Sequence, residues 1–229
     1  MQLYSITGGN IEDLNNKQYN IGVGISLGNK WFSVENIVEL VKWSFKYTKE
    51  NVVVYVADSI HAINLEVRNR ISKEKALEKA DKAGDDILRE VELALKEQLN
   101  LSEFNKVIFV KWTELLDQSF LNKTTYLKDL YLNNLDFKNY IHSIVRDFTS
   151  KEDRVFSDED INRFGDYIIE EMPEIINRIN MRGVACDAYA YPFTGKLIEF
   201  TDKIQKGEIF PEIKENVMDT EPKVFLEVR

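Results

Sequence analysis

Ser26 stands in a pattern that could make it a nucleophile. Residues 24–28 read G-I-S-L-G, a G-x-S-x-G sequence that in serine hydrolases places the serine at a sharp turn between a strand and a helix. In those enzymes the strand lies in the middle of the sheet, whereas here the serine follows the first strand that we expect. Three small residues also recur often by chance, so the pattern alone is weak evidence for a hydrolase.

A serine hydroxyl reacts well only when another group accepts its proton, and the two histidines of the chain are poor candidates for that base. We expect His61 at the end of the next strand, with little of the chain between it and Ser26. His142 lies beside Ile141 in an expected amphipathic helix, where a histidine is more often a residue at the edge of the core. Neither histidine has metal-ligand spacing around it, so we expect no metal site. Ser26 is therefore structural, or its substrate is already activated.

A second set of polar side chains is suited to binding an amine. Tyr167 and Glu171 are four residues apart, so they share one face of an expected helix over 158–180. A carboxylate there can bind the ammonium group that every amino acid carries, and the phenol can add a second contact. Tyr191 ends an expected strand, which is a usual ligand position in parallel sheets. Taken alone, a tyrosine and a glutamate at this spacing are most often a surface pair.

The elements that must position these residues form an α/β pattern. Continuous apolar runs predict buried parallel strands at 20–26 and 52–57. A third and a fourth strand are expected at 106–112 and 183–191, and an alternating run predicts an edge strand at 223–228. Ser33 is expected to cap a helix over 36–43, which gives a right-handed βαβ unit. Further helices are expected at 72–99, over most of 113–148, at 158–180 and at 196–206.

The composition is that of a single globular domain over residues 1–229, with 44% hydrophobic residues and no repeat or linker. No apolar run approaches the roughly 20 residues of a membrane helix, and nothing reads as a signal peptide. The single cysteine, Cys186, suits a reducing compartment, so we expect a cytoplasmic protein, and we expect a monomer. The net charge of -9 argues against general nucleic-acid binding but allows a local basic patch.

Three of these features together resemble the motifs of the cyclodipeptide synthases. Residues 24–33 (GISLGNKWFS) resemble the serine motif of that family, and 166–173 (DYIIEEMP) match its Tyr-x-x-x-Glu-x-Pro motif. Tyr191 follows the glutamate at the separation found in the family. The likeness extends from about residue 20 to 206. The chain carries both Asn29 and Pro192, which belong to different subtypes of the family, so it departs from each.

The resemblance implies a Rossmann-like domain, with a mainly parallel sheet flanked by helices, similar to the catalytic domains of class I tyrosyl- and tryptophanyl-tRNA synthetases. It implies a reaction that uses two aminoacyl-tRNAs and no ATP, metal or other cofactor. Ser26 would accept the first aminoacyl group, and the second aminoacyl-tRNA would extend it to a dipeptide that closes into a diketopiperazine. An aminoacyl-tRNA is an activated ester, so the transfer to serine exchanges one ester for another and can proceed without a histidine base.

The resemblance also assigns roles to individual residues. The catalytic residues would be Ser26, Tyr167, Glu171 and Tyr191, and those expected to contact the aminoacyl group are Gly24, Asn29, Val54, Glu174 and Tyr189. Glu174 lies one turn beyond Glu171, and Tyr189 lies on the same side of its strand as Tyr191. Both are expected to line the pocket for the first side chain. A glutamate there would favour a polar or basic amino acid, such as histidine.

The helix over 72–99 is the candidate tRNA-binding surface, because the phosphates of tRNA bind to cationic side chains. A basic stripe on this helix consists of Lys75, Lys79, Lys82, Arg89 and Lys96. Asp86 interrupts the stripe, and Glu78, Asp81 and Asp85 flank it. The pattern is equally consistent with a solvated face whose charges pair within the helix.

Two other functions remain open. One is a serine acyltransferase or esterase that uses the G-x-S-x-G element, and the other is a non-catalytic module that binds tRNA or a nucleotide. The ATP-binding signatures of the synthetases are absent, which argues against an enzyme that activates amino acids.

Overall fold

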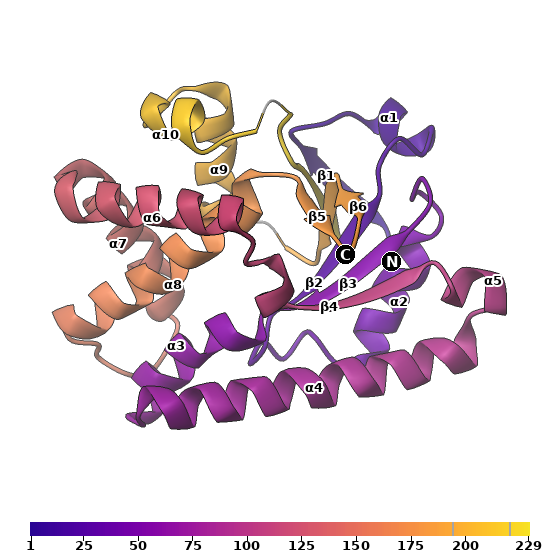
Figure 1. The fold of residues 1–229 in the computed structure, drawn as a ribbon, viewed down its shortest axis with the longest axis horizontal. Coiled ribbons are helices and arrows are strands. Elements are labelled where there is room, and N and C mark those ends of the chain that lie inside the picture. Colours follow the sequence, from indigo (N-terminus) through magenta and orange to yellow (C-terminus); the bar gives the residue numbers. More distant parts are fainter. Residues whose placement is uncertain (194, 220) are drawn as a thin grey trace.

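A six-stranded sheet forms the centre of the computed structural model, which describes residues 1–193, 195–219 and 221–229 (Figure 1). The strand order is β1-β8-β7-β2-β3-β4, and all neighbours are parallel except β1 and β8. The strands are β1 (Leu3–Thr7), β2 (Ile21–Ile25), β3 (Val52–Val56), β4 (Val107–Lys111), β7 (Ala188–Tyr191) and β8 (Val224–Val228). This arrangement confirms the predicted α/β fold with a mainly parallel sheet.

Helices cover both faces of the sheet and gather in a bundle beside it (Figure 1). The longer ones are α2 (Val34–Ser44), α3 (Asp58–Asn69), α4 (Lys73–Gln98), α6 (Gln118–Asn133), α7 (Leu135–Thr149), α8 (Asp158–Ile176) and α9 (Lys196–Lys206). Short ones are α1 (Ile11–Asn15), α5 (Leu101–Phe104), the 3₁₀ helix η1 (Trp112–Leu115) and α10 (Pro211–Asn216), and a separate hairpin consists of β5 (Ile179–Met181) and β6 (Val184–Cys186).

The core divides according to the face of the sheet. On one face, alternate residues of β2 and β3, such as Val23 and Val54, pack with α2 and α4 side chains, such as Leu40 and Val91. A second cluster fills the bundle of α6 to α10. Because helices cover both faces, every residue of β2 and β3 is buried, which explains why these strands are continuously apolar. Among the described residues, no helix is long and apolar enough to cross a membrane.

The C-terminal strand is interior, so the prediction of an edge strand at 223–228 is wrong. β8 lies between β1 and β7. Two charges, Lys223 and Glu227, made this segment look half-exposed, but their exposed fractions are 0% and 3%. Each forms an ion pair: Lys223 pairs with Glu174, and Glu227 pairs with Arg229. Paired charges can be buried where isolated ones cannot, and hydropathy patterns do not reveal the pairing.

The segment expected as one strand over 183–191 is two strands. β6 pairs with β5 in an antiparallel hairpin, and β7 pairs with β2 in the main sheet. The break falls at Asp187, whose carboxylate accepts a hydrogen bond from the Asn20 N–H at 3.0 Å. The hairpin turns at Arg182 and Gly183, which both have positive φ, as a tight turn between antiparallel strands requires.

Helix α8 ends at Ile176, earlier than the predicted residue 180. The next residue, Asn177, is extended, with φ of -110° and ψ of 155°. Its side-chain amide donates to the Pro173 carbonyl at 3.0 Å, and its amide oxygen accepts from the Asp219 N–H at 2.7 Å. These hydrogen bonds fix the end of the helix, and the extended backbone at Asn177 leads into β5.

Two expectations near Ser26 also need correction. β1, which the sequence pattern did not predict, precedes β2, and β2 lies within the sheet, between β7 and β3. The serine therefore does follow a central strand. Helix α3 was not predicted either, and it begins only two residues after β3. His61 lies in this helix, so the prediction that it ends a strand is wrong.

Candidate active site

Ser26 follows β2 at the place where the strand order reverses. From β2 the chain passes through α2 to β3 and β4 on one side, while β7 and β8 lie on the other. In open α/β sheets, ligands bind outside the carboxyl ends of the strands at such a place. β7 ends at Tyr191 and runs parallel to β2. The sheet therefore brings Ser26 and Tyr191 to the same edge, as predicted from the position of Tyr191.

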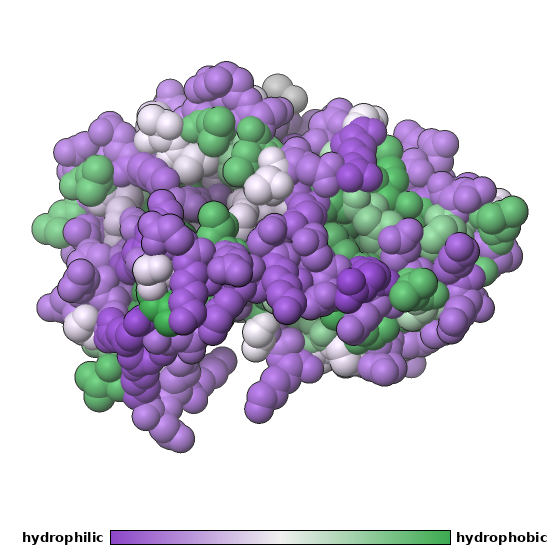
Figure 2. Space-filling model, turned by 60° about the horizontal axis from the view of Figure 1, so that its bottom comes forward, coloured by the Kyte–Doolittle hydropathy of each residue, from purple (hydrophilic) through white to green (hydrophobic). Residues whose placement is uncertain are grey.

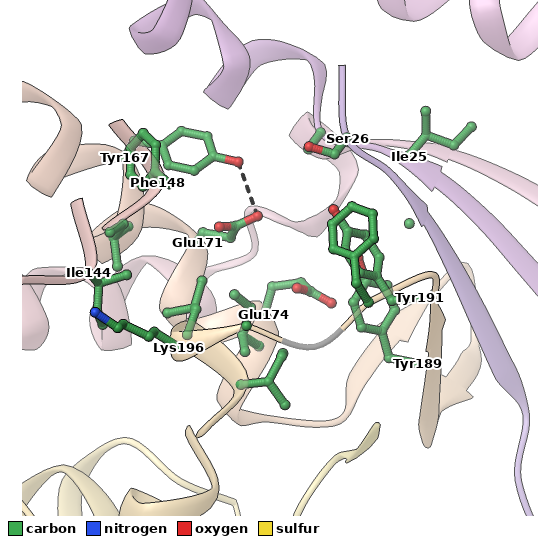
Figure 3. Close-up of a pocket in the computed structure, with 18 of the residues that line it drawn as sticks. Ile25, Ser26, Ile144, Phe148, Tyr167, Glu171, Glu174, Tyr189, Tyr191 and Lys196 are labelled. Atoms are coloured by element: carbon green, nitrogen blue, oxygen red, sulfur yellow. Dashed lines mark hydrogen bonds between the residues drawn. The ribbon is translucent and has the colours of Figure 1, made fainter. Parts of the chain in front are cut away.

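A cavity of about 440 Å³ opens at this edge. Its lining includes all the predicted catalytic residues together with three of the predicted substrate contacts: Ser26, Tyr167, Glu171, Tyr191, Gly24, Glu174 and Tyr189. Helix α8 supplies the two glutamates on one side, and the sheet supplies Ser26 and the tyrosines of β7 on the other (Figure 3). Apolar residues of α7 and α9, such as Ile144 and Leu197, line much of the remaining wall.

Tyr167 and Glu171 form a hydrogen-bonded pair on one face of α8, as their spacing predicted. The Tyr167 hydroxyl donates to Glu171 Oε1 at 3.2 Å (Figure 3). Burial, together with the nearby Glu174 carboxylate, raises the pKa of Glu171 to about 8, although the Tyr167 hydrogen bond and the Lys223 charge oppose the rise. Glu171 therefore titrates in the same range as an α-amino group, whose pKa is about 8. A proton can pass between two such groups at little cost.

Tyr191 lies next to the predicted nucleophile. Burial and the Glu171 charge raise the pKa of Tyr191 to about 12, while hydrogen bonding to the Ser26 and Asn29 side chains lowers it. The phenol is therefore neutral over the physiological range and points toward Ser26 (Figure 3). It is placed to exchange a hydrogen bond with the serine hydroxyl.

Asn29 belongs to the loop around Ser26. Its N–H donates to the Ser26 carbonyl at 3.3 Å, and its Oδ1 accepts from the Trp31 N–H at 3.1 Å. The cavity lining does not include Asn29. The side chain therefore shapes the loop and reaches Tyr191, and its predicted contact with the aminoacyl group stays a prediction.

Glu174 lies in the cavity wall, as predicted, and is 2% exposed. Two side chains that the sequence did not single out bind it. The Tyr55 hydroxyl donates to Glu174 Oε1 at 2.6 Å, and the Lys223 ammonium binds the same oxygen. Tyr55 was hidden in a strand of valines, and Lys223 in a segment that looked exposed. For Tyr55 the one available signal was a hydroxyl inside an otherwise apolar strand.

The β-strand alternation corrects one predicted contact. Val54 points to the opposite face of the sheet, where it packs in the core with α2, so its predicted role in the cavity is wrong. Its neighbour Tyr55 faces the cavity instead. Gly24 lines the cavity, but the space above it holds Tyr189. A Cβ on Gly24 would lie 2.4 Å from the Tyr189 hydroxyl, so glycine is needed there for the tyrosine to pack.

Neither histidine is placed as the base of a serine hydrolase. His142 Nε2 lies 2.8 Å from the Tyr131 hydroxyl on the bundle, outside the cavity lining, which confirms its position at the edge of the core. His61 lies beside Gly28, where a Cβ would be 3.1 Å from His61 Cε1. Burial lowers the pKa of His61 to about 4. In the described part of the chain, no hydrogen bond joins Ser26 to either histidine.

The family model for cyclodipeptide synthases matches residues 7–209. The chain belongs to the cyclodipeptide synthase family. The resemblance inferred from the serine motif, the Tyr-x-x-x-Glu-x-Pro motif and Tyr191 is thereby confirmed. A search of the curated proteins found no match.

Solved structures extend this result to the fold. A cyclodipeptide synthase from Staphylococcus haemolyticus has a TM-score of 0.75 at 16% identity, over 100% of this chain and 99% of that one. The synthase from Candidatus Glomeribacter gigasporarum, solved bound to Phe-tRNAPhe, has a TM-score of 0.52 at 16% identity, over 92% and 88%. Tyrosyl-tRNA synthetase from Archaeoglobus fulgidus, complexed with L-tyrosine, has a TM-score of 0.55 at 14% identity, over 95% and 57%. The predicted synthetase-like fold is confirmed.

In this member of the cyclodipeptide synthase family, the predicted basic stripe lies on α4, the long helix along the lower side of Figure 1. Its five cations, Lys75, Lys79, Lys82, Arg89 and Lys96, are all exposed. Arg89 pairs with Asp86 at 2.7 Å, but within the described ranges the four lysines have no ion pair. Asp81 and Asp85 instead bind Lys111 of β4.

Figure 2 turns this side of the molecule forward and shows a largely hydrophilic surface. Because Lys111 engages two of the acids that flank the stripe, the four lysines stay available for an external anion. The reading of the stripe as a set of intrahelical ion pairs therefore holds for Arg89 alone.

No cluster of three or more His, Cys, Asp or Glu side chains among residues 1–193, 195–219 and 221–229 could hold a metal ion. The expectation that the cyclodipeptide synthase needs neither a metal nor ATP stays a prediction.

Proposed function

We propose that this protein makes cyclic dipeptides from two aminoacyl-tRNAs and carries the acyl groups on Ser26. The observation that carries the proposal is that Ser26, Tyr167, Glu171 and Tyr191 meet in one cavity of a chain from the cyclodipeptide synthase family. An acyl carrier needs a nucleophile, a group that holds the substrate amine and a group that moves protons. The four side chains supply these three functions.

In the first step, Ser26 Oγ attacks the ester carbonyl of an aminoacyl-tRNA. A new ester bond forms on the serine, the bond to the terminal ribose of the tRNA breaks, and the hydroxyl proton goes to the ribose oxygen. Glu171 and Tyr167 hold the α-ammonium group, which is common to all amino acids. Tyr191, placed beside Ser26, is suited to stabilise or relay the proton.

In the second step, the amine of the aminoacyl-enzyme attacks the ester carbonyl of the second aminoacyl-tRNA. A peptide bond forms, the ester bond to the second terminal ribose breaks, the ribose oxygen takes a proton from the attacking amine, and the dipeptide is left on Ser26. That amine must first lose a proton from its ammonium form. The ionised form of Glu171 is suited to accept it, because its pKa of about 8 matches that of the amine, whereas an ordinary carboxylate is too weak a base. The terminal amine of the dipeptide then attacks the serine ester, which closes the ring and returns the proton to Ser26.

The lysines of α4 are proposed to bind the tRNA backbone. The relative solved with Phe-tRNAPhe supports the use of a charged tRNA as substrate. Exposed cations without ion pairs bind phosphates through the release of counterions. Such a reaction takes place where aminoacyl-tRNAs are, so we keep the prediction of a cytoplasmic protein. We also keep the prediction of a monomer, which gel filtration would test. The prediction of activity without ATP or metal would be tested by assays that contain EDTA and no ATP.

The test is expression in bacteria, followed by mass spectrometry of the medium for diketopiperazines, with Ser26→Ala as the control. Product that depends on Ser26 supports the proposal. Esterase activity without diketopiperazine would replace it with the acyltransferase or esterase reading. If neither activity is found but aminoacyl-tRNA binds, the protein is a tRNA-binding module.

A further inference from the structure

Only one oxygen of the Glu174 carboxylate has a hydrogen-bond partner among the described residues. Glu174 Oε1 accepts from the Tyr55 hydroxyl at 2.6 Å and also binds the Lys223 ammonium. Within the described part of the chain, no hydrogen bond reaches Oε2. The residue is 2% exposed, and its carboxylate points from α8 into the cavity toward Tyr189 and Tyr191 (Figure 3). Oε2 is not among the fully buried atoms without a partner in the described residues, so it is accessible from the cavity. A side chain that fills this part of the cavity must supply a donor to Oε2 or leave it without a hydrogen bond.

The charge of this carboxylate is already balanced. Lys223 is 0% exposed and binds Glu174 twice, through the carboxylate and through the backbone carbonyl at 2.8 Å. The ammonium also lies 5.1 Å from the centre of the Tyr189 ring. A cationic ligand group beside this pair would leave one buried positive charge in excess, and an anionic group would be repelled by Glu174. A neutral donor satisfies Oε2 without changing the net charge.

The surroundings of Glu174 are aromatic. The rings of Tyr55 and Tyr189 lie 5.8 Å apart, and those of Tyr189 and Tyr191 are stacked at 5.3 Å. Trp112 also lines the cavity. Ring faces of this kind pack well against another flat group. An apolar side chain would fit this wall but would leave Oε2 without a hydrogen bond.

We propose that the first amino acid loaded on Ser26 has a neutral side chain with an N–H or O–H donor, which binds Glu174 Oε2. The aromatic wall favours a ring that carries the donor, as in tyrosine, tryptophan or neutral histidine. This inference rests on the proposed function and narrows the expectation from the sequence, because Lys223 removes the reason for a basic side chain. Glu174 and Lys223 together determine specificity, and neither takes part in the acyl transfer.

Loading of Ser26 is measured directly by intact-protein mass spectrometry. The purified protein is incubated with one charged tRNA at a time, for all twenty amino acids, and Ser26→Ala is the control that forms no adduct. We expect the fastest adduct to come from an uncharged donor side chain. If the fastest comes from an aliphatic residue, phenylalanine, lysine, arginine or an acid, the inference is overturned while the proposed function stands. If no charged tRNA gives an adduct, the proposed function fails and this inference with it.

A double variant tests the residues themselves. Glu174→Leu with Lys223→Met replaces the ion pair by apolar groups of similar size, a change that buried ion pairs often tolerate. We expect loading of the preferred amino acid to fall at least about tenfold relative to leucine and phenylalanine. An unchanged ratio overturns the inference. If the double variant does not fold, Glu174→Gln is tested by the same ratio of loading, the preferred amino acid relative to leucine and phenylalanine. Glu170→Gln is the control, because Glu170 lies on the outer side of α8 and pairs with Lys128; this variant is expected to load like the wild type.

Discussion

Replacing Glu171 with glutamine should make the protein more stable at alkaline pH while it removes activity. The pKa of Glu171 rises from 4.5 to about 8 on folding, chiefly through burial. Between these two pH values the unfolded chain has released a proton that the folded chain still holds. The free energy of unfolding therefore falls as the pH rises through this window. At 1.36 kcal/mol for each pH unit, the loss between pH 5 and pH 8 is about 3 kcal/mol.

Glutamine has nearly the same shape and can still accept the Tyr167 hydrogen bond, but it does not titrate. The difference in unfolding free energy between Glu171→Gln and the wild type should therefore be below about 1 kcal/mol at pH 5, and it should shift by about 3 kcal/mol in favour of the variant by pH 8. Urea unfolding, followed by tryptophan fluorescence at several pH values, measures this difference. Taking the difference at each pH cancels the titration of the other groups. The variant should form no diketopiperazine, because an amide holds an ammonium group poorly and accepts no proton from it.

Glu170→Gln is the matched control. Glu170 is the preceding residue, its side chain is 33% exposed, and it pairs with Lys128 at 2.8 Å. A surface ion pair of this kind contributes less than about 1 kcal/mol, so the Glu170→Gln variant should be about as stable as the wild type. If the stability of Glu171→Gln followed the wild-type curve in parallel from pH 5 to pH 8, burial would not shift the pKa of Glu171, and its role as a base near neutral pH would be refuted.

Two further predictions concern other parts of the molecule. Changing Lys75, Lys79 and Lys82 to glutamate should raise the KM for aminoacyl-tRNA and make this KM less dependent on salt, while kcat at saturation stays the same. An unchanged KM in steady-state assays would show that α4 does not bind the tRNA. Lys223→Met alone should destabilise the protein by about 3–5 kcal/mol in urea unfolding, because it leaves the Glu174 charge buried without a partner, and a loss below about 1 kcal/mol would contradict the buried ion pair.

The sequence by itself determined the central part of the fold. Strands 20–26 and 52–57 were predicted because parallel strands buried on both faces must be continuously apolar, and β2 and β3 are buried throughout. The strand predicted at 106–112 is also present, but β4 lies at the edge of the sheet and is only partly buried. The cap at Ser33 was also confirmed, since its hydroxyl accepts from the Asn36 N–H at 3.3 Å. These features depend on neighbouring residues, so a local pattern is sufficient to find them. The membership of the family likewise came from short motifs at fixed separations.

The site was predicted in part for the same reason. Tyr167 and Glu171 share a helix face, which their spacing alone dictates. That Tyr191 lies beside Ser26 depends on β7 pairing with β2, a contact between segments far apart in the chain. The position of Tyr191 at the end of a strand indicated the edge of the sheet, and the motif resemblance supplied its proximity to Ser26.

Only the tertiary structure decided which residues surround the substrate cavity away from those motifs. Lys223 looked like a residue of an exposed edge strand, yet it is buried because Glu174, on another element, balances its charge. Val54 and Tyr55 were equally apolar in context, and the packing of α2 on one face of the sheet decided that Tyr55 faces the cavity. Charge pairing and the choice of face are properties of contacts between distant segments. For this protein the sequence therefore predicted the role of Ser26, and the fold decided which side chains line its cavity.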